Sequence, residues 1–410
     1  MSDLNSWKKK RNLLLCVTGG IAAYKIPNLV RLLKKSDLEI EILLTKSAEK
    51  FVSPLVLSTL SGKKVWRNED FFSDESGFKI PHINLARNSE IIVIAPCTAN
   101  TIAKIAHGFS DDLLSATVLA KNENSKVLIF PAMNENMLEN PLTQENLKIL
   151  SEKGFSIIEP NNGDLACGVS GKGRMPEPQE ILQEIFRALS PVHDMIGKRV
   201  LVTAGATHEF IDPVRFISNP SSGKMGVSIA RAAWYRGAEI KLILGASNND
   251  LNLYGFQVEK VSSTQNMLDA VMNNLEDSDI IVKAAAVGDY RAKDFQAKKI
   301  KRQNRDEIQI TLIQNPDISF EVGKNKRDNQ ILIGFAAETD DLIKNAREKL
   351  SRKNLDYILA NDVSAENSGF AVDTNTLRLI AKNPDIPEAI FSGLKEDISY
   401  EIWDCINKSC

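Results

Sequence analysis

Cys167 is the residue of this chain whose surroundings most clearly favour chemistry. It lies in NNGDLACGVSGKGRMPEP, residues 161–178, a segment with four glycines and two prolines. So many breakers predict a mobile loop or flap and argue against a regular element. A thiol whose pKa is about 8.5 is mostly protonated at neutral pH and can donate a proton. Because a buried core cysteine needs no glycines around it, Cys167 is predicted to be a reactive thiol on this flap.

Glycines and small polar residues follow the apolar runs of the first half. Gly19 and Gly20, in TGGIAAYK, follow the run 12–18, where bare N–H groups could hold a phosphate, although a simple tight turn explains them equally well. Thr45 follows the run 39–45 and alone reads as a helix cap. Later runs end in further donors with similar alternatives of capping or core packing: Thr98, Asn100 and Thr101 in APCTANT, and Asn134 beside Met133 and Met137 in PAMNENM.

The second half contains TAGATHEFIDPVRFISNPSSGKMG, residues 203–226, which could be mistaken for a phosphate-binding P-loop. That motif requires a glycine where Ser218 stands and Ser or Thr where Met225 stands, so a Walker-type ATPase is excluded. Further along, Lys349 and Lys353 lie four residues apart on a predicted helix. Like charges at that spacing repel one another, which favours an anion between them.

Two α/β domains are expected to position these residues. Short apolar runs alternate with amphipathic stretches, which predicts parallel strands covered by helices on both faces. The segment 190–198 resembles a linker, so we expect domains at 1–190 and 191–410. The expected strands are 12–18, 39–45, 91–95, 126–130, 199–203, 239–244, 279–283, 331–335 and 357–360. The expected helices are 180–189, 224–236, 264–275 and 340–352.

The composition favours a small-molecule enzyme. The 51 basic and 53 acidic residues of the 410 give a net charge of -2, so neither nucleic acid nor membrane is expected as a partner. No leader-like or membrane-spanning apolar run is visible, and we expect a cytoplasmic protein. Five cysteines without C-x-x-C spacing and four histidines argue against a disulfide framework and a protein-held transition metal. Any metal is expected to arrive with a phosphate ligand.

Five ordered motifs of the first half resemble the phosphopantothenoylcysteine decarboxylase half of bifunctional coenzyme A biosynthesis enzymes: TGGIAAYK, PHINLA, APCTANT with SDDLLSAT, PAMNENM and ACGVSGKGRM. The resemblance implies a flavodoxin-like domain with His82 as the active-site histidine, Asn134 as the carboxylate ligand and Cys167 as the proton donor. His82 alone would read as structural. The FMN contacts that it implies are Gly19, Gly20, Ile21, Ala22, Thr45, Cys97, Thr98, Ala99, Asn100 and Thr101.

The implied chemistry suits these residue types. Flavin oxidation of a cysteine-derived thiol supplies the electron sink that loss of CO2 requires. His82 could accept a proton, and Asn134 could bind the carboxylate without a fixed cation that would over-stabilise the ground state. Cys97 stands where the family usually has alanine and is interpreted as a tolerated small residue.

Motifs of the second half resemble the phosphopantothenate cysteine ligase half of the same enzymes, a Rossmann-like domain: SNPSSGKMG, AAAVGDY, KKIKR, NPDI, GFAAET and KLSRKNLDYILANDVS. The resemblance implies activation of 4'-phosphopantothenate by CTP as an acyl-cytidylate, which Asn219 stabilises, followed by attack of cysteine. Asp289 would hold Mg2+. The implied CTP contacts are Ala285, Ala286, Asp289, Lys299, Pro316, Asp317, Ile318, Ser319, Phe335, Lys349 and Lys353.

Some features leave alternatives open. Lys299, in KKIKR, would alone read as part of a solvated basic loop. Ala206 and Gly288 replace the usual proline and alanine of the family motifs, and both replacements are small. A flavin-binding regulatory protein of the same fold is the alternative function, and the absence of a dinucleotide fingerprint disfavours a nicotinamide oxidoreductase. The family also implies a homo-oligomer with shared sites.

Overall fold

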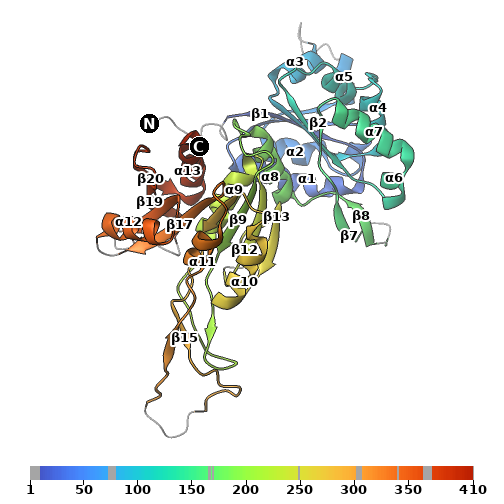
Figure 1. Cartoon of the computed structure of the whole chain (residues 1–410). Helices are drawn as coiled ribbons and strands as arrows, with labels where there is room; N and C mark the ends of the chain where they lie inside the picture. The colour runs from blue at the N-terminus through green and yellow to red at the C-terminus, as the bar shows by residue number, and fades with distance from the viewer. Residues whose placement is uncertain are drawn as a thin grey trace. The chain divides into compact units, whose positions relative to one another are not determined.

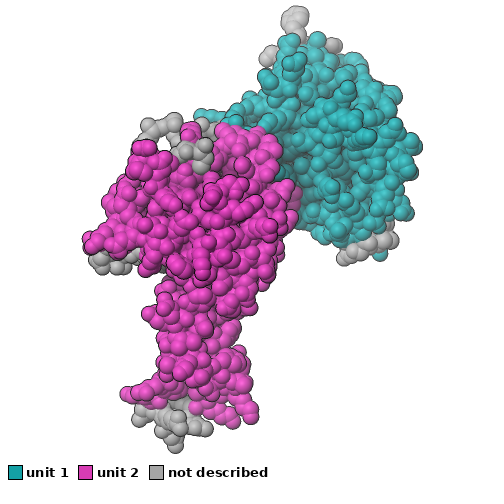
Figure 2. All heavy atoms as spheres, viewed as in Figure 1, with its two compact units in different colours: residues 1–191 teal, residues 192–410 magenta. Residues whose placement is uncertain are grey.

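The computed structural model describes residues 10–72, 80–164, 168, 170–247, 250–301, 307–338, 341–362 and 372–409. The chain divides into two compact units, residues 1–191 and 192–410 (Figure 2). Each unit has a central sheet with helices on both faces (Figure 1). The predicted fold class, two doubly wound α/β domains, is confirmed.

Unit 1 has a parallel sheet whose first strand in the chain lies near its centre. Every residue of β4 is buried, as are five of the six residues of β1, because helices cover both faces. In spatial order the strands are β3 (Val65–Arg67), β2 (Glu39–Leu44), β1 (Asn12–Val17), β4 (Ile91–Cys97), β5 (Lys126–Pro131) and β6 (Ser156–Ile157).

Helices pack on this sheet with their apolar sides. Leu29, Val30 and Leu33 are buried on one side of α1, while Arg31 and the two lysines that end the helix are not. One face of the sheet carries α1 (Ile26–Lys35), α2 (Pro54–Ser61) and α8 (Pro178–Leu189). The other carries α3 (Pro81–Asn88), α4 (Ala99–Ala106), α5 (Leu113–Leu119) and α7 (Pro141–Glu152). Shorter elements are η2 (Ile21–Lys25), η3 (Ala48–Lys50), η4 (Asn68–Phe72) and α6 (Glu135–Glu139).

The glycine-rich segment 161–178 contains regular structure, contrary to the expectation of a loop without it. β7 (Asn161–Asp164) and β8 (Ser170–Arg174) form an antiparallel hairpin with an irregularity in register at its base. Gly163 and Gly173 adopt positive φ angles of 155° and 137° in the ladder, which glycine accepts readily. The prediction failed because glycines were counted as breakers although two of them serve the hairpin. Cys167 lies outside the described residues.

Unit 2 has a larger, mixed sheet. Its parallel part places β9, the first strand of the unit, between β12 and β14, and two antiparallel strands extend one edge. In spatial order the strands are β13 (Phe256–Lys260), β12 (Glu239–Leu244), β9 (Arg199–Ala204), β14 (Ile280–Lys283), β17 (Ile331–Glu338), β18 (Tyr357–Asp362), β19 (Thr374–Ala381) and β20 (Ala389–Leu394).

In the described part of unit 2, five helices cover this sheet. One face carries α9 (Lys224–Tyr235) and α13 (Lys395–Ser409), which pack on each other. The other face carries α10 (Thr264–Leu275), α11 (Ile318–Asn325) and α12 (Leu342–Arg352), whose Met267, Ile318 and Ala346 join the core with Ile281 of β14. Across the described residues of both units, no helix is long and apolar enough to cross a membrane.

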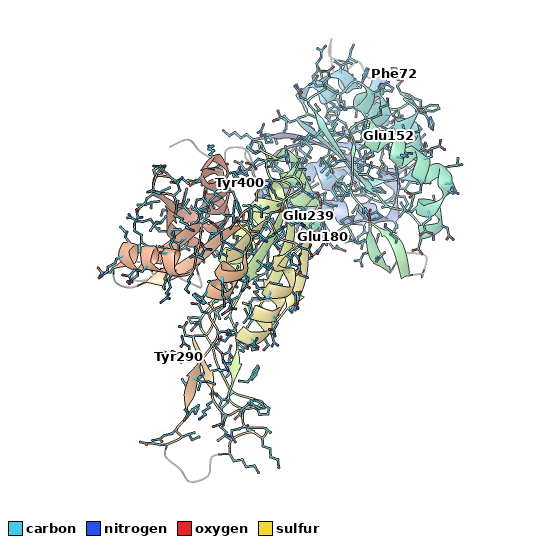
Figure 3. All side chains as sticks on the ribbon, in the orientation of Figure 1. Phe72, Glu152, Glu180, Glu239, Tyr290 and Tyr400 are labelled. Atoms are coloured by element: carbon cyan, nitrogen blue, oxygen red, sulfur yellow. The ribbon has the colours of Figure 1, made fainter. Side chains whose placement is uncertain are left out.

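A narrow arm projects from the sheet of unit 2 (Figure 1). It contains two short antiparallel pairs, β10 (Glu209–Phe210) with β11 (Phe216–Ile217) and β15 (Tyr290–Ala292) with β16 (Leu312–Gln314). His208 stacks on Phe216 with ring centroids 3.8 Å apart. Tyr290, labelled on the arm in Figure 3, is more than half exposed.

Candidate functional sites

Unit 1 has a cavity of about 530 Å³ at the carboxyl edge of its sheet. The turn after β1 and the start of α4 after β4 both contribute to it, and these neighbouring strands lead to opposite directions of winding. Open α/β sheets bind ligands at such a switch point. The lining residues are Gly19, Gly20, Ile21, Ala22, Tyr24, Lys25, Thr98, Ala99, Ala132, Met133, Asn134, Met137, Gly173, Arg174 and Met175.

The turn after β1 presents backbone donors to this cavity. A Cβ atom on Gly19 would lie 2.3 Å from the Cβ atom of Ser47, so the turn requires glycine there. Gly20 caps η2 without a side-chain hydrogen bond, which leaves the helix start open toward an anion. Thr18 fixes the adjacent loop, because its hydroxyl donates to Pro96 O (2.7 Å) and accepts from Thr98 N (3.1 Å).

Asn134 lies at the opposite wall, at the N-terminus of α6. Its Oδ1 accepts a hydrogen bond from Asn136 N at 2.9 Å, which fixes the orientation of the side-chain amide. The base of the β7–β8 hairpin seats on the same segment. Met133 N donates to Gly173 O at 3.2 Å, and Lys172 N donates to Glu135 Oε1 at 2.9 Å. The segment that carries Cys167 is therefore joined at its base to the wall that carries Asn134.

An ion-pair cluster closes the floor of the cavity, and sequence reasoning missed it. Lys25, which is 6% exposed, donates to Glu177 Oε1 at 2.7 Å and to Met175 O at 3.3 Å. Arg174 donates to the same Glu177 oxygen at 2.6 Å. Burial raises the pKa of Glu177, but the two cations outweigh it and lower that pKa overall. A lysine in the otherwise apolar start of a helix, IAAYKIP, was the available signal.

The other predicted residues of unit 1 lie apart from this lining. Thr45 accepts a hydrogen bond from Ala48 N at 3.3 Å and so helps to cap η3. Thr101 contacts the hydroxyl of Thr98 at 3.2 Å behind the cavity wall, and Asn100 beside it is exposed. Cys97 is fully buried, and burial raises the pKa of its thiol, so it is an uncharged core residue.

His82 is on α3 and is likewise absent from the cavity lining. Its ring meets Phe71 edge-on, with centroids 5.3 Å apart. Its Nδ1 atom is buried and has no hydrogen-bond partner. A buried ring nitrogen without a partner is costly, so this atom is available to a ligand that reaches it.

Unit 2 has a cavity of about 380 Å³ at the carboxyl edge of its own sheet. It lies where β9 and β14 lead to the loops 205–223 and 284–289, again at a switch point. Five predicted residues meet in it: Asn219, Ala285, Ala286, Asp289 and Phe335. The other lining residues are Pro220, Ser221, Ser222, Gly223, Lys224, Met225, Gly226, Ala284, Val287, Ala336, Asn361, Asn375, Leu377 and Lys395.

Hydrogen bonds between the two loops fix the position of Asn219. Its amide Nδ2 donates to Val287 O at 2.9 Å, and Ser218 Oγ donates to Thr207 O at 2.8 Å. Gly288 N donates to Thr207 Oγ1 at 2.9 Å, which holds the loop that carries Asp289. The side chain of Asn219 and the backbone of the loop that carries Asp289 thus belong to one hydrogen-bonded framework.

The remaining predicted residues lie outside this lining. Pro316 and Asp317 directly precede α11, which begins with Ile318 and Ser319, and Asp317 Oδ2 pairs with Lys353 Nζ at 2.8 Å. Burial raises the pKa of Asp317, but Lys353 outweighs it and lowers the pKa overall. Lys349 precedes Lys353 by one turn, and Lys299 is exposed on the arm.

Several polar residues of the cavity were not predicted. Lys395 is 5% exposed; its desolvation and the nearby Lys224 lower its pKa. Lys224 pairs with Asp373 at 2.6 Å, and Asn361 Oδ1 is buried without a partner. Asn361 is the next-to-last residue of β18 and Lys395 begins α13, so their places near element ends were the available signal. No group of three or more His, Cys, Asp and Glu in the described parts of the chain could hold a metal by itself.

Comparisons with known proteins match each half of the chain to a family. Residues 1–190 match the family described as "Flavoprotein", and residues 195–409 match "DNA/pantothenate metabolism flavoprotein C-terminal domain". The coenzyme A biosynthesis bifunctional protein CoaBC of Bacillus subtilis is 42% identical over 96% of this chain and 95% of its own length. The Haemophilus influenzae protein of that name is 42% identical over 91% and 92%.

One solved structure is also similar to part of the chain. The C-terminal domain of a coenzyme A biosynthesis bifunctional protein CoaBC is 36% identical, with a TM-score of 0.43, over 53% of this chain and 97% of that one. With relatives more than 40% identical over nearly its full length, the chain belongs to the family of bifunctional coenzyme A biosynthesis proteins.

Proposed function

We propose that this protein joins 4'-phosphopantothenate to cysteine and then decarboxylates the product, 4'-phospho-N-pantothenoylcysteine, to 4'-phosphopantetheine. Unit 2 would catalyse the CTP-dependent ligation and unit 1 the FMN-dependent decarboxylation. The supporting observation is that each unit has one cavity at a switch point, lined by residues of the family motifs. Family membership over nearly the whole chain supports both halves of the proposal.

The residues of unit 1 fit FMN. The open N-terminus of η2 and the hydroxyl of Thr98 can bind a phosphate, while Met133 and Met137 offer apolar surface to a flat ring. When bound, FMN supplies the two-electron oxidation of the substrate thiol and the later return of hydride. The amide NH2 group of Asn134 binds the carboxylate that leaves as CO2.

Two further groups move protons in this half. The Nδ1 of His82, which has no hydrogen-bond partner, would accept a proton as the substrate thiol is oxidised. Cys167 would donate a proton to the carbon that has lost CO2, while the sulfur-bearing carbon regains hydride. The base of the β7–β8 hairpin is hydrogen-bonded to the wall of the cavity that carries Asn134, which supports a role of this hairpin in the decarboxylation.

Unit 2 must make a carboxylate into an acyl donor. Attack of the carboxylate on the α-phosphorus of CTP releases pyrophosphate and forms an acyl-cytidylate, whose CMP is then displaced by the amine of cysteine. Asn219 and the loop 284–289 would contact that intermediate at the cavity. Asp289 is a suitable oxygen ligand for Mg2+ that arrives with the triphosphate. Lys349 and Lys353, with Lys299 of the arm, would neutralise its charge.

We also propose a cytoplasmic homo-oligomer with shared sites. His82 and Lys299 do not line the cavities of their own units, although both belong to the motifs of those cavities. A second copy of the chain can bring each of them to the site that lacks it.

The test is to incubate the purified protein with 4'-phosphopantothenate, cysteine, CTP and Mg2+, and to identify the products by mass spectrometry. We expect 4'-phosphopantetheine, CO2, CMP and pyrophosphate, and a yellow protein that releases FMN on denaturation. Omitting CTP should stop the reaction, whereas supplying 4'-phospho-N-pantothenoylcysteine should restore it. A yellow protein that forms neither 4'-phospho-N-pantothenoylcysteine nor 4'-phosphopantetheine would refute the proposal and favour a flavin-binding regulatory protein.

A further inference from the structure

Lys283, the last residue of β14, is a buried cation without a partner. Its side chain is 6% exposed, and its Nζ atom has no hydrogen-bond partner. Its neighbours across the ladder are Thr203 and Gly334, neither of which carries a charge. A buried ammonium group that lacks an acceptor is costly, so it requires a reason to be there.

Two charged groups act on Lys283 from α11 and α12, which pack on one face of the sheet of unit 2. Asp317, at the N-terminus of α11, attracts it, and Lys353, at the C-terminal end of α12, repels it. The Asp317 carboxylate is already engaged, because it pairs with Lys353 at 2.8 Å and accepts a hydrogen bond from Phe320 N at 3.2 Å. Two lysines thus face one carboxylate, and the N-terminus of α11 adds partial positive charge.

Lys283 directly precedes residues of the cavity that we propose binds the nucleotide. Lys283 is followed directly by Ala284 to Val287, which line the cavity of unit 2. An excess of buried positive charge at that edge is stabilised by an anion and not by a neutral ligand. Of the proposed substrates, the nucleotide carries the most negative charge.

We propose that Lys283 is a further contact for the triphosphate of the nucleotide, in addition to the residues of the family motifs. This assignment rests on the proposed CTP-dependent ligation. Desolvation lowers the pKa of Lys283 to about 7; the positive charge of Lys353 lowers it further, and the carboxylate of Asp317 opposes the shift. Near neutral pH the amine is therefore about half protonated in the free protein, and a bound triphosphate takes it to the ammonium form.

Proton uptake on CTP binding tests this role in the full-length protein. Calorimetric titration with CTP and Mg2+ at pH 7, in two buffers with different ionisation enthalpies, gives the affinity and the number of protons bound. We expect the wild type to take up about half a proton per site more than Lys283→Met. The variant should bind CTP about tenfold more weakly, the loss expected for one charged hydrogen bond.

Lys241→Met is the matched control. Lys241 is a strand residue of the same sheet, pairs with Glu259 at 3.0 Å and does not line the cavity of unit 2. This variant should bind CTP like the wild type and with equal proton uptake. Circular dichroism should show that Lys283→Met is folded, because methionine fills a similar volume without a charge.

The possible outcomes separate the two proposals. Equal CTP affinity and equal proton uptake in wild type and Lys283→Met would overturn the role of Lys283 and leave the ligation intact. Failure of the wild type to bind CTP would overturn both. Extra proton uptake with 4'-phosphopantothenate in place of CTP would also refute the assignment, because it would give the lysine to the other substrate.

Discussion

The burial of Lys283 should make the stability of unit 2 depend on pH in the absence of nucleotide. Its pKa is about 7 in the folded protein and 10.5 in an unfolded chain. Between these values the unfolded state binds more protons, so the free energy of unfolding rises as the pH rises. From pH 7.5 to 9.5 the wild type should gain about 2.5 kcal/mol relative to Lys283→Met, slightly less than the limiting slope of about 1.4 kcal/mol per pH unit would give, because the folded lysine is still partly protonated at pH 7.5.

Tryptophan fluorescence during urea denaturation can measure this difference. Trp234 and Trp403 of unit 2 are both buried, so replacing Trp7 and Trp66 by phenylalanine limits the signal to that unit. The protein concentration should be constant, and Lys241→Met should keep the pH dependence of the wild type. If the wild type and Lys283→Met show parallel stability curves across this range, Lys283 is not desolvated and the reasoning is refuted.

Three substitutions test other parts of the two sites. Gly19→Ala should destabilise unit 1 by about 1–3 kcal/mol and reduce its bound flavin, because the new Cβ would lie 2.3 Å from the Cβ of Ser47. Gly20→Ala is the control, since a Cβ on Gly20 meets nothing within 3.7 Å. Equal denaturation midpoints for the two variants would contradict this prediction. Cys167→Ser should retain FMN and ligation but stop before the reduced product; normal 4'-phosphopantetheine formation by this variant would exclude the proton-donor role. Asn219→Asp should block ligation, measured as CMP release, while decarboxylation of supplied substrate continues; loss of both activities would indicate misfolding.

Much of the fold was predictable because its strands are buried on both faces. The run 239–244 is β12 without a change of boundary, and the helix expected at 264–275 is α10. The prediction was less complete for strands that are buried on one face only and for segments whose conformation depends on their surroundings in the fold. The antiparallel edge strands β19 and β20 were not predicted, because their residues alternate between buried and exposed. The hairpin β7–β8 contains glycines with positive φ angles, and glycines in a sequence are usually interpreted as signs of a loop.

The same distinction between predictable and context-dependent features applies to the two candidate sites. Motif residues that follow strands, such as Gly19, Thr98 and Asn219, meet at the sheet edges, because parallel strands bring their carboxyl ends together. Lys25, despite its unusual place in an apolar helix start, and Lys283 were not assigned from sequence. Whether a lysine is buried, and whether it finds a carboxylate as Lys25 does or lacks a partner as Lys283 does, depends on side chains distant in the chain.

The central position of β1 and of β9 in their sheets has a consequence for synthesis. Each is the first strand of its unit to leave the ribosome, and later strands add outward from it on both sides. The sheet of unit 1 can be complete, with α8 packed on α1, once residue 191 has emerged. Unit 2 must wait for α13, which packs on α9 near the beginning of the unit. We therefore expect the flavoprotein half to fold first during synthesis, and the ligase half to fold only once α13 has emerged.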